Sequence, residues 1–200
     1  MTPTLAAAAT VSLPGVYRAG QTARDEPPGL PSGCTALDAA LPWGGFPRGA
    51  LCELLPAATG IGELQFLLPA LRRLPLDARI VLIDPPFLPY APAWAAAGLA
   101  LERLVWIATP SPRLALWSSE QCLRAGCLAA VLSWSTLDDD RALRRLQLAA
   151  QHGDAYAWLF RPRRHAANPS PAALRLLLDA GRVEVLKCRG ALPRQAFARA

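Results

Sequence analysis

Short apolar runs alternate with longer amphipathic segments through most of the chain. The apolar runs predict buried strands at residues 50–55, 78–84, 104–108, 127–134 and 156–160. Helical spacing between them predicts helices that follow residue 62 and that span 90–97, 112–125 and 138–151. Two further runs, 174–179 and 183–187, flank a turn and predict a hairpin. Strands that lack a polar face and alternate with helices predict an α/β fold, with a mostly parallel sheet flanked by helices and a C-terminal antiparallel hairpin.

The segment 49–71 is a strand, a glycine-containing loop and a helix. This is the frame of a phosphate-binding loop, in which backbone N–H groups and a helix N-terminus face an anion. Such a loop needs Gly-Lys-Ser/Thr, but here Gly62 is followed by Glu63 and Leu64. We therefore interpret Thr59, Gly60, Gly62 and Glu63 as a degenerate phosphate loop. A plain strand-to-helix turn and a loop that binds an anion both stay open.

Length and composition fit one domain with short flanking segments. The 200 residues are 52% hydrophobic, which is ample material for a core. We expect a flexible N-terminal segment at 1–28, the folded domain at 29–190 and a C-terminal tail at 191–200. No apolar run is long enough to span a bilayer, and the N-terminus lacks a charged leader. The expected location is the cytoplasm, without membrane contact.

The charge is carried almost entirely by arginine. The net charge is +6, and Lys187 is the only lysine, so no second segment can supply a phosphate-loop lysine. Arginine suits phosphate and carboxylate partners. The five cysteines form no C-x-x-C pair, and neither His152 nor His165 has ligand-spaced neighbours. We expect no disulfide, metal or cofactor, and two solvated loop histidines.

Two groups of residues are candidates for a partner surface. The helix predicted at 138–151 carries a basic stripe, Arg141, Arg144 and Arg145, which is either solvated or a contact surface. Of the six tryptophans, those within predicted strands (Trp106, Trp134 and Trp158) are expected in the core. Trp43 in a glycine-rich turn and Trp117 on a helix are candidate interface anchors.

The amino-acid sequence resembles that of a known group of proteins. The run GLPSGCTALDAALPWGGFPRGALCELL is similar to the start of the RecA core, and the similarity continues through ARIVLID, LRAGCLAAVLSW and AYAWLFRP across residues 29–190. Three segments more specifically resemble the ImuA family, a RecA-like accessory of SOS mutagenesis. They are LPWGGFPRGALCELL, GIGELQFLLPAL and RALRRLQLAA. SulA, the SOS inhibitor of cell division, belongs to the same degenerate RecA-like group. Its sequence is similar to this one around the helix predicted at 112–125 and in the strand that follows.

The chain departs from RecA at three functional positions. Glu63 stands near the phosphate-loop lysine, and Ser133-Trp134 stands where the metal-directing aspartate would follow the fourth strand. Prolines follow Asp84, where a water-activating glutamate is expected. The resemblance therefore implies a pseudo-ATPase that makes or breaks no bond. The loss of these three functional residues argues against a further hypothesis, that the protein is an active DNA recombinase.

The resemblance also implies partners. An ImuA-like protein would assemble or recruit ImuB, and through it an error-prone polymerase and the sliding clamp, at damaged DNA; RecA itself is a further candidate. The cluster Arg161, Arg163, Arg164 and His165 falls where RecA carries a DNA-binding loop, so it is either a solvated basic loop or a salt-sensitive contact with single-stranded DNA. The alternative is a SulA-like inhibitor that binds the division GTPase FtsZ.

Overall fold

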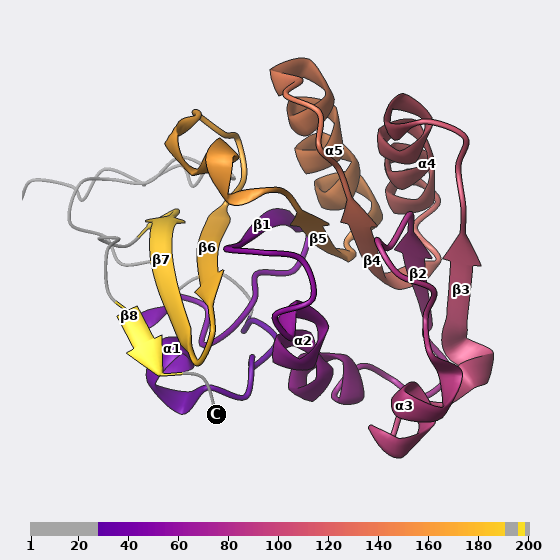
Figure 1. Ribbon diagram of the computed structural model, residues 1–200, viewed down its shortest axis with the longest axis horizontal. Helices are drawn as coiled ribbons and strands as arrows, with labels where there is room; N and C mark the ends of the chain where they lie inside the picture. Colours follow the sequence, from indigo (N-terminus) through magenta and orange to yellow (C-terminus); the bar gives the residue numbers. More distant parts are fainter. Residues whose placement is uncertain (1–27, 191–195, 199–200) are drawn as a thin grey trace, which may run out of the picture.

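The computed structural model describes residues 28–190 and 196–198 (Figure 1). Its α-helices are α1 (Thr35–Ala40), α2 (Glu63–Arg72), α3 (Ala91–Ala96), α4 (Pro112–Arg124) and α5 (Asp140–Gly153), with 3₁₀ turns η1 (Leu101–Arg103) and η2 (Arg163–Ala167). Its strands are β1 (Ala50–Pro56), β2 (Arg79–Ile83), β3 (Leu104–Ile107), β4 (Leu128–Trp134), β5 (Tyr156–Phe160), β6 (Leu174–Asp179), β7 (Arg182–Cys188) and β8 (Ala196–Ala198).

The strands within the described residues form one eight-stranded sheet in the order β3-β2-β4-β5-β1-β6-β7-β8. From β3 to β6 all neighbours are parallel, whereas β7 and β8 are antiparallel additions at one edge. The carboxyl ends of β1, β2, β4 and β5 therefore meet at one edge of the sheet, which is where open α/β sheets bind ligands.

Helices cover both faces of the sheet, so the central strands are apolar on both sides. One core contains Leu54, Leu82 and Trp158 and packs against α1, α2 and α3. The other contains Leu51, Val131 and Leu159 and packs against α4 and α5. Figure 1 shows α4 and α5 together on one side of the sheet and α1, α2 and α3 on the other. No helix in the described residues has the length and apolarity required to cross a bilayer.

The predicted α/β class is confirmed, including the C-terminal hairpin, which β6 and β7 form. The helix predicted at 138–151 begins at Asp140, because Asp139 is its N-cap and accepts a hydrogen bond from Ala142 N–H at 2.9 Å. The tail predicted at 191–200 contains β8, which pairs with β7. Residues 1–27 of the predicted N-terminal segment lie outside the described residues.

The three strand tryptophans differ in burial, and one of them corrects the prediction. Trp158 is buried on a central strand, and Trp134 is half-buried. Trp106 is 52% exposed, although its own strand is apolar. The reason is topological, because β3 is the last strand of the sheet and, among residues 28–190 and 196–198, no further strand flanks its outer side.

Candidate functional site at the carboxyl edge of the sheet

A cleft of about 610 Å³ lies at the carboxyl edge of the parallel strands. Its walls are rich in proline and aromatic side chains, namely Pro56, Pro86, Pro110, Trp134, Phe160 and Pro162. The rings of Trp134 and Phe160 stack with centroids 4.5 Å apart. Arg163 and Arg164 line one side of the cleft, and Asp84 lines another. The cleft therefore has rigid apolar walls and charged groups at its margin.

The glycine-containing loop connects β1 to α2, as the sequence predicts. Gly60 and Gly62 have φ values of 84° and 83°, which are accessible to glycine at no steric cost. Glu63 begins α2, is only 5% exposed, and accepts a hydrogen bond from Gly60 N–H to Oε1 at 3.1 Å. Its other oxygen, Oε2, is buried and has no hydrogen-bond partner among the described residues. The carboxylate of Glu63 thus already accepts a hydrogen bond from a backbone amide of the loop.

Asp84 ties two neighbouring strand ends together beside this loop. It follows β2 with φ of 49°, an uncommon conformation for a residue other than glycine. Its Oδ1 accepts from Thr109 N–H at 2.6 Å, and its Oδ2 accepts from the Thr109 hydroxyl. Both carboxylate oxygens of Asp84 are therefore used to hold the segment after β3.

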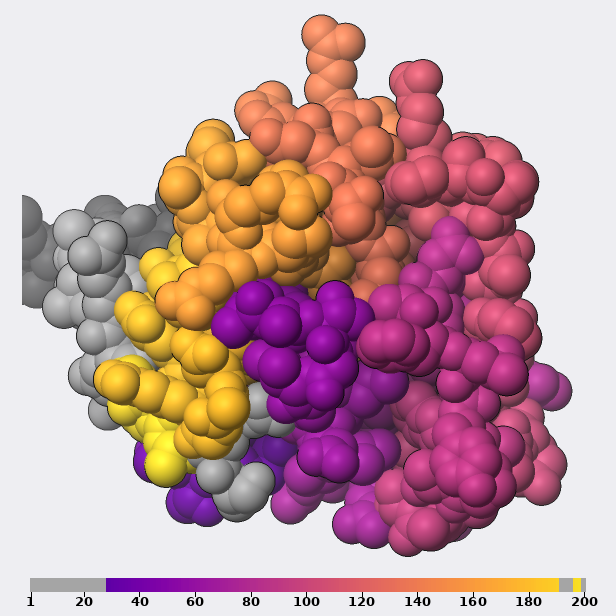
Figure 2. All heavy atoms as spheres, viewed as in Figure 1, coloured from indigo at the N-terminus to yellow at the C-terminus, as the bar shows by residue number. Residues whose placement is uncertain are grey.

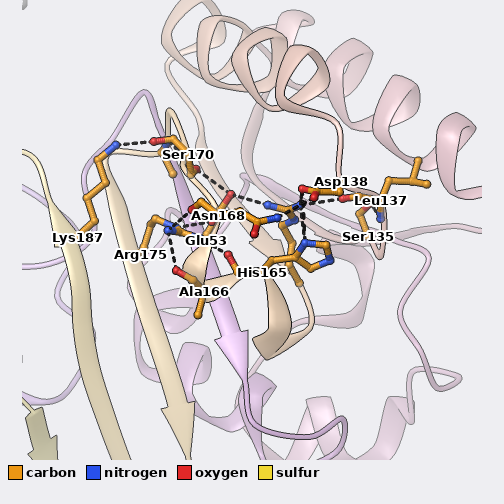
Figure 3. Close-up of polar contacts among 12 residues, drawn as sticks. Glu53, Ser135, Leu137, Asp138, His165, Ala166, Asn168, Ser170, Arg175 and Lys187 are labelled. Atoms are coloured by element: carbon orange, nitrogen blue, oxygen red, sulfur yellow. Dashed lines mark hydrogen bonds and ion pairs between the residues drawn. The ribbon is translucent and has the colours of Figure 1, made fainter.

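Beneath the cleft, a buried carboxylate joins three neighbouring strands (Figure 3). Glu53 lies in the middle of β1 and is fully buried. Its Oε2 accepts from Arg175 Nε at 2.7 Å, and its Oε1 accepts from Arg161 Nη1 at 3.3 Å and from the Ser170 hydroxyl at 2.8 Å. Two guanidinium groups and a hydroxyl thus compensate the desolvation of this carboxylate.

The two arginines extend this network into the surrounding loops. Arg161 Nη2 donates to Leu137 O at 2.8 Å and to Asp138 Oδ1 at 3.2 Å, in the segment that follows β4. Arg175 donates to the carbonyls of residues 165, 166 and 168, at 2.7, 3.3 and 2.9 Å respectively. The connector between β5 and β6 is therefore fixed to the sheet by its own backbone carbonyls (Figure 3).

His165 is an interior member of the same network. Its Nδ1 lies 3.1 Å from Arg161 Nη2 and 3.6 Å from Asp138 Oδ1. Burial, and secondarily the positive charge of Arg161, lower the pKa of His165 and outweigh the opposite effect of Asp138. Hydrogen bonds, first from Asn168 and then from Arg161, lower the pKa of Asp138. The neutral imidazole can accept at Nδ1 from Arg161, so the network is matched to an uncharged His165 and a charged Asp138.

These positions correct part of the predicted DNA contact. Arg161 and His165 are 1% and 4% exposed, so neither is a solvated loop residue nor available to a nucleic acid. Arg163 and Arg164 are exposed, but Arg163 pairs with Asp179 at 3.0 Å, and Arg164 Nη2 donates to Thr136 O at 3.5 Å. The four side chains consequently form no continuous basic surface.

The residues predicted to form a partner surface also differ in their exposure. Trp43 is 4% exposed and belongs to the core beside α1, so the prediction of an interface anchor is wrong for it. Its turn is folded inward because Gly29 N–H donates to Trp43 O at 2.6 Å, and Leu30 pairs with Phe46. Trp117 is 56% exposed on α4, and Arg141, Arg144 and Arg145 are exposed on α5.

The residues at the centre of the buried network, Glu53 and Arg175, were not singled out from the sequence. The available signal was a single charge inside an apolar run, as in ALCELLP and LRLLLD. An isolated charge in a central strand requires a buried partner, and in parallel strands that partner comes from a distant part of the chain. Among the described residues, no group of three acidic, histidine or cysteine side chains is arranged to hold a metal ion.

The fold and the site define a mixed α/β domain with a glycine-containing loop between β1 and α2 and with carboxyl-edge loops held by a buried ion-pair network. A family model described as the cell division inhibitor SulA matches residues 51–157, just over half of the chain. The chain therefore belongs to the SulA family.

The chain is also similar to individual SulA proteins. The chain is 33% identical over 101 residues to the cell division inhibitor SulA of Yersinia pestis, covering 49% of the chain and 59% of that protein. It is 29% identical over 123 residues to SulA of Serratia marcescens, covering 60% of the chain and 72% of the relative. The alignment with the Yersinia protein thus spans about three-fifths of that relative. The crystal structure of SulA from Pseudomonas aeruginosa is 29% identical, with a TM-score of 0.48 over 56% of this chain and 97% of that one.

The family match corrects the main functional hypothesis. The resemblance to the SulA group is confirmed, whereas the comparisons give no support to the ImuA family in particular. The expected role of recruiting ImuB and an error-prone polymerase is contradicted, because the match over residues 51–157 is to a cell division inhibitor.

Proposed function

We propose that this protein inhibits cell division by binding FtsZ and blocking its polymerisation, without making or breaking a covalent bond. The observation that carries the proposal is the match of residues 51–157 to the SulA family model. The relatives bear the name of cell division inhibitor, and FtsZ is the partner that the resemblance to SulA implies. By the same resemblance, the inhibitor would act in the cytoplasm after DNA damage.

We also propose that the domain is a degenerate RecA-like core without ATPase activity. The frame of strand β1, glycine loop and helix α2 supports this, as does the parallel sheet that ends in an antiparallel hairpin. Glu63 stands at the loop and bonds Gly60 N–H, so a negative charge already faces the amide that would bind phosphate. The sequence similarity to the ImuA family at residues 41–55 would then reflect common descent, and it does not imply binding to ImuB.

A fixed surface suits an inhibitor that acts by binding alone. The network around Glu53 anchors the segment after β4 and the connector between β5 and β6. Because these loops are already ordered, little conformational entropy would be lost when a partner binds.

The test is FtsZ assembly with purified components. FtsZ and GTP are mixed with increasing amounts of the full chain, and polymer is measured by sedimentation and GTP turnover by phosphate release. The expected result is loss of sedimented FtsZ as the chain approaches equimolar amounts. The exposed-surface variant Arg182→Glu serves as a control and should inhibit equally. Unchanged polymer at a tenfold molar excess of the chain would refute the proposal.

A parallel assay addresses the absence of ATPase activity. The chain is incubated with ATP and Mg²⁺, with and without single-stranded DNA, and phosphate release is followed. We expect no turnover above the buffer in either case. Turnover that disappears in Glu63→Ala would contradict the proposed degenerate site.

A further inference from the structure

The outer surface of α4 and α5 is strongly basic and has an exposed tryptophan within it. It consists of Arg113, Trp117 and Arg124 of α4 and Arg141, Arg144 and Arg145 of α5, here called the α4–α5 face. The two helices lie side by side on the same side of the sheet (Figure 1), and side chains from both segments project from the upper edge of the molecule (Figure 2).

A buried acid joins the two helices beneath this face. The Glu120 side chain is 10% exposed, and its oxygens lie 3.3 Å from Arg124 Nη2 and 2.9 Å from Arg145 Nε. Trp117 is one helical turn before Glu120, so it stands on the α4 surface that adjoins α5. Glu120 thereby fixes the spacing of the two helices that make the face.

The positive charge of the face is only partly compensated within the described part of the chain. Arg113, Arg141 and Arg144 form no ion pair there, and Glu120 neutralises only part of the charge of Arg124 and Arg145. The acids that border the face are those at the start of α5, where Asp138, Asp139 and Asp140 line a hollow with Arg113 and Arg141. The remaining surface of the two helices presents cations without exposed acids.

Exposed apolar groups lie among these cations. Trp117 is 56% exposed, and Leu114 and Leu148, on the same outer surfaces of α4 and α5, are 42% and 61% exposed. Tryptophan and arginine are the residue types that contribute most often to protein–protein binding energy, and the aliphatic part of an arginine packs well beside a ring. A face with cations around a tryptophan is complementary to an acidic protein surface that has an apolar centre.

A nucleic acid fits this face less well. Strands of nucleic acid bind along grooves with several stacking aromatic rings, whereas the α4–α5 face carries one such ring, Trp117, on exposed helices. The observations therefore favour a protein partner.

We propose that the α4–α5 face is the docking surface for an acidic protein surface, and that Trp117 is its apolar anchor. The name of that partner, FtsZ, rests on the proposed function. Association would be steered by the arginines, so its rate would fall as salt rises, and Trp117 would mainly govern dissociation.

The experiment measures binding of FtsZ to the full chain by surface-immobilised kinetics at low and moderate salt. The test variants are Trp117→Ala and the double variant Arg141→Glu/Arg144→Glu. Arg141 lies in the first turn of α5, where an acid is favourable, so its reversal should leave the helix folded. The matched control is Arg73→Glu/Arg182→Glu, which changes the charge equally at exposed positions on α2's C-terminus and β7.

The expected result is at least a tenfold weaker affinity for each test variant and less than a twofold change for the control. If the double test variant binds FtsZ as tightly as the control does, the proposed docking surface is wrong and the proposed function still holds. If the wild-type chain fails to bind FtsZ, the proposed function is wrong, and the face is tested with poly-L-glutamate at low salt. If Arg141→Glu/Arg144→Glu weakens binding to polyglutamate and the control variant does not, the docking surface is supported. If both double variants bind polyglutamate equally, the docking surface is wrong. Selective loss of binding to single-stranded DNA, with polyglutamate binding unchanged, would also overturn it, because the partner would then be a nucleic acid.

Discussion

Arg175 donates from Nε to Oε2 of Glu53 at 2.7 Å, and the two residues are direct neighbours across the parallel strands β6 and β1. Both side chains are buried, at 6% and 0% exposure respectively. Arg161 approaches the same carboxylate from the end of β5. One acid thus links three strands with the loops at the carboxyl edge, and this relationship sets the geometry of the cleft above it.

Replacement of Glu53 should destabilise the whole domain. Glu53→Ala leaves two guanidinium groups buried without their carboxylate, and the free energy of unfolding should fall by about 3–5 kcal/mol. Urea denaturation followed by circular dichroism measures the change. Glu102→Ala, at an exposed position of η1, is the control and should alter stability by less than about 0.5 kcal/mol. A loss of similar size in the two variants would contradict the role of the network.

Mild acid should weaken the fold through His165. Its pKa is lowered from 6.5 in the folded protein, so below about pH 6.5 the unfolded chain takes up a proton that the folded chain does not. The free energy of unfolding therefore decreases as the pH falls from about 6.5 toward the folded pKa, and this contribution becomes constant below it.

The variant His165→Gln isolates this effect. Its stability, measured by urea denaturation from pH 7.5 to 5, should depend less on pH than that of the wild type. His152→Gln, at an exposed position of α5, should retain the wild-type slope. Asp138 has a pKa below 3.8, so its contribution is lost only at lower pH, outside this range. Parallel curves for His165→Gln and the wild type would exclude His165 as the titrating group.

Removal of the Glu63 carboxylate should expose an anion site in the loop. In the wild type, Gly60 N–H is bonded to Glu63, so sulfate should leave the melting temperature unchanged beyond its general salt effect. In Glu63→Ala, sulfate at about five times its dissociation constant should raise the melting temperature by about 2–4 °C. Chloride at matched ionic strength is the salt control. Equal responses of wild type and variant to sulfate would show that the Glu63 carboxylate does not block an anion site in the loop.

Trp43 and Trp117, which both lie outside the strands, should respond oppositely to truncation. Trp43 is buried, so Trp43→Ala should reduce the free energy of unfolding by about 3–5 kcal/mol. Trp117 is mostly exposed, so Trp117→Ala should change stability by less than about 0.5 kcal/mol. Thermal and urea denaturation of both variants decide the matter, and a stable Trp43→Ala protein would restore Trp43 as a surface residue.

Local sequence patterns were enough to predict the α/β class, the order of the elements and the glycine loop before α2. These features follow from local information, because apolar runs, helical spacing and turn residues lie within short stretches of chain. The strand 156–160 and the hairpin of β6 and β7 were predictable for this reason. That Gly62 is followed by Glu63 and not by a lysine could likewise be read from the loop alone.

Which charges and aromatic rings are buried depends on the assembled sheet and could not be predicted from local patterns. Arg161 looked like part of a basic loop until β1 placed Glu53 beside it, and Trp106 looked like a core residue until β3 proved to be the edge strand. Glu53 and Arg175 are 122 residues apart in the chain, and no local pattern relates them. Their pairing is set by the parallel register of β1 and β6, because burial of a charge depends on neighbours that only the assembled sheet brings together.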